Sequence, residues 1–206
     1  MKIKVCGMKY AENISRLEAL KTDYMGFIFY EKSPRFAAGL SEDVLNGLSA
    51  DIIKTGVFVN EDADVISKLI YKYKLDAVQL HGSENPAFCE LFKHEVQVIK
   101  AFGVNDDFDF DQLKLYVGKV DYFLFDTKTS AHGGSGIVFD WSVLDNYTID
   151  VPFFLSGGLS VENIADIKKI KHPQFYGVDL NSRFEIESGL KDIDKLETAF
   201  KTIKNI

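Results

Sequence analysis

The sequence repeats one pattern along its length: a short apolar run, a polar loop and then an amphipathic segment. The runs are rich in valine, isoleucine and phenylalanine, as are strands that are buried on both faces of a parallel sheet. They lie at residues 2–6, 24–29, 52–58, 77–80, 96–102, 122–125, 153–155 and 175–180. Eight alternations of strand and helix predict an α/β protein with a parallel sheet.

The segments between the runs are predicted to be helical. One helical face is formed by Val65, Ile66, Leu69, Ile70 and Tyr73, and residues 193–203 repeat this spacing. Asn60 and Ser160 stand where N-caps are expected. Further helices are predicted at residues 11–20, 41–48, 85–94, 106–117 and 141–147, the last of them short.

Eight such units are the number that closes a (β/α)8 TIM barrel, for which about 200 residues is the lower limit. The chain has 206 residues and shows no linker or change of composition. We therefore expect a single compact (β/α)8 barrel domain over residues 1–206. A doubly wound open sheet is the alternative.

Composition excludes some classes of function. A net charge of -7 argues against a nucleic-acid-binding protein, which needs clustered lysine and arginine, but not against a small anionic substrate. Cys6 and Cys89 form no disulfide framework, which favours a reducing compartment. The sequence shows no secretory signal and no apolar run long enough to span a membrane, so a cytoplasmic protein is expected. The four histidines are scattered, which argues against a metal site.

In a (β/α)8 barrel the carboxyl ends of the strands meet around one mouth, where the chemistry takes place. The polar residues that end the apolar runs are therefore predicted to form one site. They are Cys6, Arg35, Gln79, His81, Asp126, Ser156, Gly157, Gly158, Asp179, Asn181 and Ser182.

Two loops of small residues predict a phosphate site. Gly157 and Gly158 follow the seventh run, and Asn181 and Ser182 follow the eighth. Glycines allow backbone N–H groups to approach an oxyanion, and the loops after strands seven and eight hold phosphate in many barrels. A pair of tight turns without a ligand is the alternative.

Cys6 and Asp126 are candidates for acid–base chemistry. Lys4 lies two residues before Cys6 on the same strand face, and a neighbouring cation favours the thiolate, although a free cysteine is often only a small core residue. Asp126 ends a very apolar run, so partial desolvation is expected to raise its pKa and make it an acid near neutral pH. A helix cap or a salt bridge is the alternative for Asp126.

The glycine-rich residues 127–136 predict a loop that closes over a ligand.

The remaining charged candidates have two interpretations each. Lys4, Lys100 and Asp126 are predicted to share the barrel interior, either as structural ion pairs or in catalysis. Arg35 lies on a proline-containing turn and suits bidentate recognition of a carboxylate, unless it is an ordinary surface arginine. His81 either lines the mouth or is a packed, hydrogen-bonded histidine.

Taken together, these motifs resemble the phosphoribosylanthranilate isomerase family, whose members are (β/α)8 enzymes of the tryptophan pathway. The matching stretches run in the expected order and span nearly the whole chain. They are residues 4–8, 26–29, 33–35, 56–58, 78–84, 124–127, 133–136, 139–141, 155–159 and 177–179.

The resemblance implies a reaction without a cofactor, the Amadori rearrangement of N-(5'-phosphoribosyl)anthranilate to 1-(2-carboxyphenylamino)-1-deoxyribulose 5-phosphate. By this resemblance Asp126 would be the general acid, Cys6 the general base, and Arg35 the residue that holds the anthranilate carboxylate. The phosphate would be held by Gly157, Gly158, Asn181 and Ser182, and the rest of the pocket would include Lys4, Gln79, His81 and Asp179. The partner would be this small molecule, with no nucleic acid, membrane or metal, and the enzyme would be a monomer or a homodimer.

The sequence departs from the family at two places. Lys9 stands where threonine is frequent, and Asn181-Ser182-Arg183 stands where Ser-Ser-Gly is common. One alternative function is a different phosphosugar enzyme, such as an isomerase of a related aminosugar. The other is a non-catalytic phosphosugar-binding barrel, which would need neither Cys6 nor Asp126.

Overall fold

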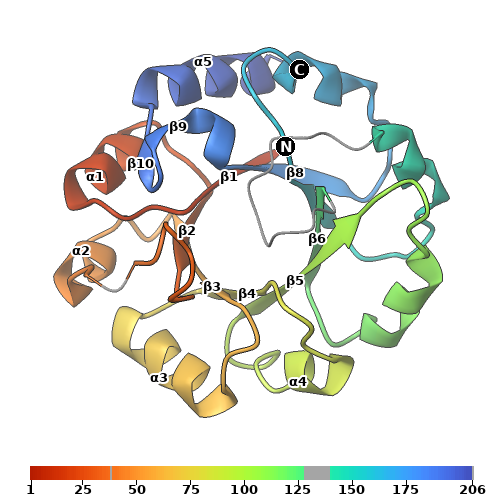
Figure 1. The fold of residues 1–206 in the computed structure, drawn as a ribbon, viewed down its shortest axis with the longest axis horizontal. Helices are drawn as coiled ribbons and strands as arrows, with labels where there is room; N and C mark the ends of the chain where they lie inside the picture. Colours follow the sequence, from red (N-terminus) through yellow and green to blue (C-terminus); the bar gives the residue numbers. More distant parts are fainter. Residues whose placement is uncertain (38, 128–139, 206) are drawn as a thin grey trace.

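The computed structural model of the chain describes residues 1–37, 39–127 and 140–205. Within these ranges eight parallel strands pair in chain order, and the eighth pairs with the first to close a barrel (Figure 1). The strands are β1 Lys2–Cys6, β2 Tyr24–Ile28, β3 Ile53–Phe58, β4 Ala77–Leu80, β5 Gln97–Val104, β6 Tyr122–Thr127, β7 Phe153–Leu155 and β8 Phe175–Leu180. The predicted (β/α)8 barrel is confirmed.

Helices surround the barrel and cover the outer face of the sheet (Figure 1). The α-helices are α1 Ala11–Ala19, α2 Glu42–Asn46, α3 Ala63–Tyr73, α4 Pro86–Glu90 and α5 Ile193–Lys204. The segments predicted near residues 106–117 and 141–147 are 3-10 helices instead. The 3-10 helices are η1 Phe110–Tyr116, η2 Trp141–Asn146, η3 Ile164–Lys169 and η4 Ser182–Phe184.

Both predicted N-caps are wrong. Asp62 caps α3 by accepting a hydrogen bond from the N–H of Asp64. Asn60 lies before it with a left-handed φ of 51°, and its side chain accepts hydrogen bonds from Ser83 instead. Ser160 also lies too early, because η3 begins only at Ile164.

Two groups of apolar side chains lie on the two faces of the sheet. The larger group packs between the strands and the helices. The smaller group fills the inside of the barrel with Tyr24, Ile99, Ala101, Leu124 and Phe154. The rings of Tyr122 and Tyr176 pack beside it, with centroids 4.7 Å apart. Because these side chains fill the amino-terminal part of the interior, space for a ligand remains at the carboxyl ends of the strands.

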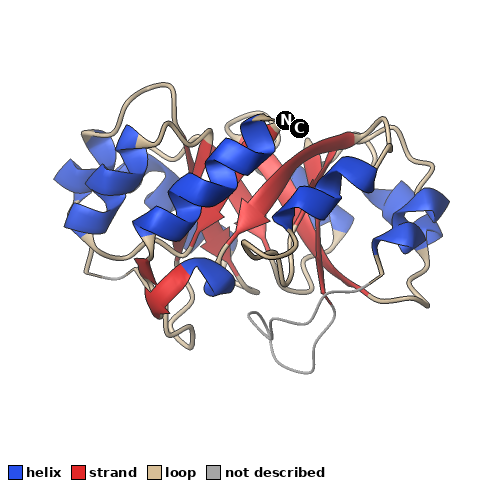
Figure 2. Cartoon of the chain, turned by 90° about the horizontal axis from the view of Figure 1, so that it is seen from above, coloured by secondary structure: helices blue, strands red, loops and turns tan. Residues whose placement is uncertain are grey.

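A two-stranded antiparallel sheet follows β8 and was not predicted from the sequence. It consists of β9 Glu185–Glu187 and β10 Leu190–Lys191. Figure 2 shows this hairpin at one end of the barrel, and the chain termini at the opposite end. The hairpin therefore belongs to the end at which β8 finishes.

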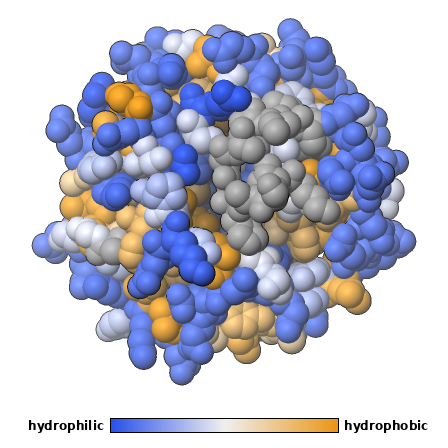
Figure 3. Space-filling view, viewed as in Figure 1, coloured by the Kyte–Doolittle hydropathy of each residue, from blue (hydrophilic) through white to orange (hydrophobic). Residues whose placement is uncertain are grey.

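Hydrophilic residues occupy most of the periphery in the view along the barrel axis (Figure 3). A membrane-crossing helix needs about 20 apolar residues. Among the described residues, no helix has the length and the apolar character to cross a bilayer.

Candidate active site

A cavity of about 190 Å³ opens at the carboxyl ends of the barrel strands. Its lining comes from β1 to β4, from β6 and β8, and from loops that include the one after β7. Among the predicted site residues it includes Cys6, Arg35, Gln79, His81, Asp126, Ser156, Gly157, Gly158, Asp179, Asn181 and Ser182. Residues far apart in the sequence thus meet around one cavity. Lys4 does not line it.

Lys4 instead supports the cavity from inside the barrel. It is fully buried, and its Nζ lies 2.8 Å from Oδ1 of Asp179 in an ion pair. The other carboxylate oxygen of Asp179 lies 3.4 Å from the hydroxyl of Ser156. The ion pair joins β1 to β8 and fixes the Asp179 carboxylate at the base of the cavity.

The Cys6 thiol lies at the end of β1, directly beside Gly26 of β2. A Cβ atom on Gly26 would lie 2.7 Å from Sγ, so the missing side chain provides the space that the thiol occupies. Burial raises the pKa of the Cys6 thiol, although Lys4 acts in the opposite direction. Desolvation outweighs Lys4 because this cation is already paired with the Asp179 carboxylate, which itself raises the pKa of Cys6.

Asp126 lies across the interior on β6, and its carboxylate accepts a hydrogen bond from the N–H of Thr127 at 2.8 Å. The pKa of Asp126 is raised to about 6, chiefly by burial and next by the neighbouring Asp179 carboxylate. The sequence predicted this direction and its cause. Asp126 therefore changes protonation state close to neutral pH, as an acid–base group requires.

His81 and Gln79 extend the polar lining next to Asp126. Nδ1 of His81 lies 2.7 Å from Nε2 of Gln79, and Nε2 of His81 lies 3.7 Å from Oδ2 of Asp126. The Gln79 side chain is nearly inaccessible to solvent, so it holds the imidazole ring in a fixed place.

Lys100 does not share the barrel interior, contrary to the prediction. Its strand neighbours Ile99 and Ala101 point inside, so Lys100 points to the outer face of β5. There Nζ donates hydrogen bonds to the carbonyl oxygens of Leu80, Gly82 and Ala101 and lies 3.2 Å from Glu84. Lys100 is thus a structural lysine.

Arg35 lines the cavity, but part of its guanidinium group is already paired. Nε and Nη2 form a bidentate contact with Glu185 on β9, with distances of 2.7 to 3.1 Å. Glu185 also contacts Lys191 on β10, at 2.7 Å. Glu185 and Lys191 are not predictable from the sequence as site residues, because no apolar run or motif marks such a short hairpin.

The loops after β7 and β8 present backbone donors to the cavity. Gly157 and Gly158 have φ values of 81° and 66°, which other residues rarely adopt. The N–H groups of Gly157, Gly158 and Ser182 make no hydrogen bond within the described residues. A Cβ atom on Gly157 would lie 2.7 Å from Oδ1 of Asp126, so this loop also touches the acid–base site. Among the described residues, no helix begins directly after the glycine pair, because the next helix, η3, begins at Ile164.

The glycine-rich loop was predicted to close over a ligand. Thr127 lines the cavity. Residues 128–136 lie outside the described part of the chain.

Comparisons with known proteins agree on one family. The family model described as N-(5'phosphoribosyl)anthranilate (PRA) isomerase matches residues 3–202. An N-(5'-phosphoribosyl)anthranilate isomerase from Parabacteroides distasonis is 46% identical over 206 aligned residues, which cover 98% of this chain and 93% of the relative.

Solved structures give the same result. Phosphoribosyl anthranilate isomerase from Thermotoga maritima is similar with a TM-score of 0.85 and 32% identity, and the match covers 100% of both chains. A phosphoribosyl anthranilate isomerase in complex with reduced 1-(o-carboxyphenylamino)-1-deoxyribulose 5-phosphate has a TM-score of 0.80 at 29% identity, again over 100% of both chains.

The closed barrel and the polar cavity at its carboxyl end define a (β/α)8-barrel enzyme. The matches cover nearly the whole chain, and they determine to which family of these enzymes it belongs. The chain belongs to the N-(5'-phosphoribosyl)anthranilate isomerase family. It is an isomerase of tryptophan biosynthesis and catalyses the rearrangement of N-(5'-phosphoribosyl)anthranilate to 1-(2-carboxyphenylamino)-1-deoxyribulose 5-phosphate. The resemblance found in the sequence is confirmed.

Proposed function

We propose that Asp126 is the general acid and Cys6 the general base of this rearrangement. The observation that carries the proposal is that both side chains, from strands far apart in the sequence, line one cavity. Asp126 donates its proton to the ribose ring oxygen, and the ring opens to an iminium ion. Cys6 then removes the proton from C2', which gives an enolamine that tautomerises to the ketone.

This assignment requires a protonated Asp126 and an ionised Cys6 at the same moment. With a pKa of about 6, Asp126 is protonated in about a tenth of the molecules at pH 7. Burial keeps most Cys6 thiols protonated, while the positive charges of Lys4 and Lys191 favour the thiolate. The reactive combination is therefore a minor fraction of the free enzyme.

The two charged ends of the substrate bind at the cavity wall, one to Arg35 and the other to the loops that follow β7 and β8. Arg35 binds the anthranilate carboxylate, which is supported by its place in the cavity wall and its planar guanidinium group. The phosphate binds to the backbone amides of Gly157, Gly158, Asn181 and Ser182, and the unused N–H groups in these loops support this role.

The rest of the pocket comes from residues that lie between these ends. Gln79 and His81 line the cavity beside Asp126, and Asp179 lies at its base near the sugar. Lys4 acts indirectly, by holding Asp179.

Loss of either acid–base group tests the proposal. Cys6→Ala and Asp126→Asn are each expected to lower kcat by about 10² or more, measured as the loss of anthranilate-type fluorescence. Cys89→Ala is the matched control, because Cys89 is a second buried thiol that does not line the cavity. Turnover near the wild-type rate in either variant would remove that residue from its role.

We also infer that residues 1–206 form one barrel domain and that the enzyme is a monomer or a homodimer. The single closed barrel formed by the described strands supports the one domain. Two free cysteines favour the cytoplasm as its compartment. Light scattering of the purified enzyme at assay concentration measures its mass.

A further inference from the structure

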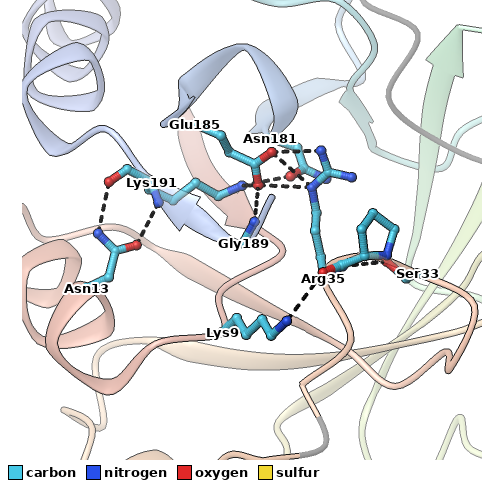
Figure 4. A network of polar contacts seen from close by, with 9 residues as sticks. Lys9, Asn13, Ser33, Arg35, Asn181, Glu185, Gly189 and Lys191 are labelled. Carbon is cyan, nitrogen blue, oxygen red and sulfur yellow. Dashed lines mark hydrogen bonds and ion pairs between the residues drawn. The ribbon is translucent and has the colours of Figure 1, made fainter. Parts of the chain in front are cut away.

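Glu185 is the centre of a hydrogen-bond network that the roles above do not use. Figure 4 shows its carboxylate between Arg35 on one side and Lys191 and the backbone of Gly189 on the other. It accepts hydrogen bonds from Nε and Nη2 of Arg35, from the N–H of Gly189 at 3.0 Å and from Nζ of Lys191 at 2.7 Å. The Glu185 side chain is only 5% exposed. A buried carboxylate with this many donors holds each of them in place.

The hairpin that carries Glu185 is itself fixed to the barrel. Lys191 pairs with Glu185 across the hairpin, and its backbone exchanges two hydrogen bonds with the side chain of Asn13 on α1. Nζ of Lys191 also donates to Oδ1 of Asn181 at the end of β8, at 2.7 Å. Lys191 thus connects the Arg35 site to the loop assigned to the phosphate.

Arg35 is held from a second direction by the backbone after Cys6. A Cβ atom on Gly7 would lie 2.8 Å from Cδ of Arg35, so the arginine side chain lies directly against the glycine. The remaining guanidinium nitrogen, Nη1, makes no hydrogen bond within the described residues and points away from Glu185 (Figure 4). The Nε and Nη2 edge of Arg35 is therefore fixed by Glu185, and Cδ is fixed by Gly7. The edge that carries Nη1 stays available at the cavity.

The network also carries a net positive charge, which favours binding of an anion. Arg35 and Lys191 are cationic, whereas Glu185 is the only carboxylate that contacts either of them among the described residues. Burial lowers the pKa of Lys191 to about 8, so most copies of this lysine remain charged at pH 7. Within the described residues, this network therefore carries one more positive than negative charge next to the cavity.

We propose that Glu185 and Lys191 are positioning residues, which present the free edge of Arg35 to the carboxylate on the aromatic ring of the substrate. They thereby determine the preference of the enzyme for substrates that carry this carboxylate. The inference rests on the role proposed above for Arg35.

Binding of two inhibitors tests it without requiring turnover. One is reduced 1-(o-carboxyphenylamino)-1-deoxyribulose 5-phosphate, and the other is the same compound without the ring carboxylate. Glu185→Gln keeps the shape but removes the charge that orients Arg35. By calorimetry it is expected to weaken the first inhibitor about 10- to 100-fold, as for a lost charged hydrogen bond, and the second less than about twofold. Lys191→Met is expected to weaken the first inhibitor too, but it also removes the contact with Asn181 of the phosphate loop, so the selectivity is measured with the Glu185 variants.

Glu187→Gln is the matched control, because Glu187 lies on the same hairpin but its side chain is exposed and accepts a hydrogen bond from Tyr10. It should leave both affinities unchanged. Glu185→Asp retains the charge but is too short for the bidentate contact, and it should show the same selective loss if Glu185→Gln fails to fold. Equal weakening of both inhibitors by Glu185→Gln and Glu185→Asp, or no weakening, overturns the proposal.

The variant Arg35→Met distinguishes the proposed role of Arg35 from the proposed positioning by Glu185. If Arg35→Met keeps the preference for the carboxylate-bearing inhibitor, the proposed role of Arg35 fails. If Arg35→Met loses the preference while both Glu185 variants keep it, Arg35 retains its role and only the positioning by Glu185 is wrong.

Discussion

At the scale of single residues, the chemistry of Asp126 depends on where β6 ends. An exposed aspartate would be ionised throughout the neutral range, but burial and the Asp179 carboxylate raise the pKa of Asp126 to about 6. Among the described residues, the polar groups around it include His81, Lys4 and the Thr127 N–H. The residue type was evident from the sequence, whereas its pKa required its neighbours.

The pH dependence of kcat/KM follows from the two assigned groups. The active form needs a protonated Asp126 and an ionised Cys6, so the rate should rise with pH up to about 6 and then stay level. It should fall again above the ordinary range of a thiol, because burial raises the pKa of Cys6. In Asp126→Asn the limb near pH 6 should disappear, and the residual rate should rise until Cys6 titrates.

His81→Asn is the control for this profile, because imidazole is the side chain that ordinarily changes charge between pH 5 and 8, and that of His81 lies 3.7 Å from Asp126. The acidic limb should remain in His81→Asn, even where the rate is lower. If the limb persists in Asp126→Asn but vanishes in His81→Asn, it belongs to the histidine.

At the scale of secondary-structure elements, the strands were predictable and their orientation was not. The runs of valine, isoleucine and phenylalanine mark β1 to β8, and the polar residue after each run locates the mouth, which is how Cys6 and Asp126 were found. Both faces of a barrel strand are buried, so an apolar run does not reveal to which face a lysine within it points. Lys100 was placed on the wrong face for this reason.

The elements that were missed are short or irregular. The hairpin formed by β9 and β10 has strands of three and two residues, too short to show a period. Its charged residues, Glu185 and Lys191, resemble ordinary surface charges in the sequence, because their burial depends on Arg35 and Asn13 from the other end of the chain. Helices η1 and η2 have an apolar pattern, but the pattern does not distinguish a 3-10 helix from an α-helix over so few turns.

The buried ion pair between β5 and the loop after β4 gives a prediction about stability. In Lys100→Met the Glu84 carboxylate loses its cation, and three carbonyl oxygens lose a donor. Removing one partner of a buried pair costs about 3–5 kcal/mol. The free energy of unfolding in urea should fall by that amount, and the double variant Lys100→Met/Glu84→Gln should recover part of it.

Lys119→Met is the comparison for this pair, since Lys119 forms a partly exposed ion pair with Glu90. Its effect should stay within about 0.5–1 kcal/mol. If Lys100→Met costs no more than Lys119→Met, the buried pair does not contribute to stability in the way its contacts indicate.

At the scale of the whole molecule, the site exists only because the sheet closes. Cys6 and Lys4 lie on the first strand, whereas Asp179 and Asn181 follow from the last, and only the pairing of β1 with β8 brings them together. The Lys4–Asp179 ion pair spans this seam directly. Stability of the seam and integrity of the cavity should therefore be linked.

Gly177 tests this link, because it lies on β8 opposite Lys2 at the closing seam. A Cβ atom there would collide with the backbone carbonyl oxygen of Lys2, and a backbone atom cannot rotate away as a side chain can. Overpacking of this kind costs about 1–3 kcal/mol. Gly177→Ala should therefore lower Tm by about 2–4 °C for each kcal/mol, as measured by calorimetry. Gly39→Ala, where nothing lies within 4 Å of the added atom, should change Tm little.

Because the seam positions Lys4 and Asp179, Gly177→Ala should also lower kcat/KM at temperatures well below its Tm. Full activity in a destabilised Gly177→Ala enzyme would show that the cavity tolerates movement of β8 against β1.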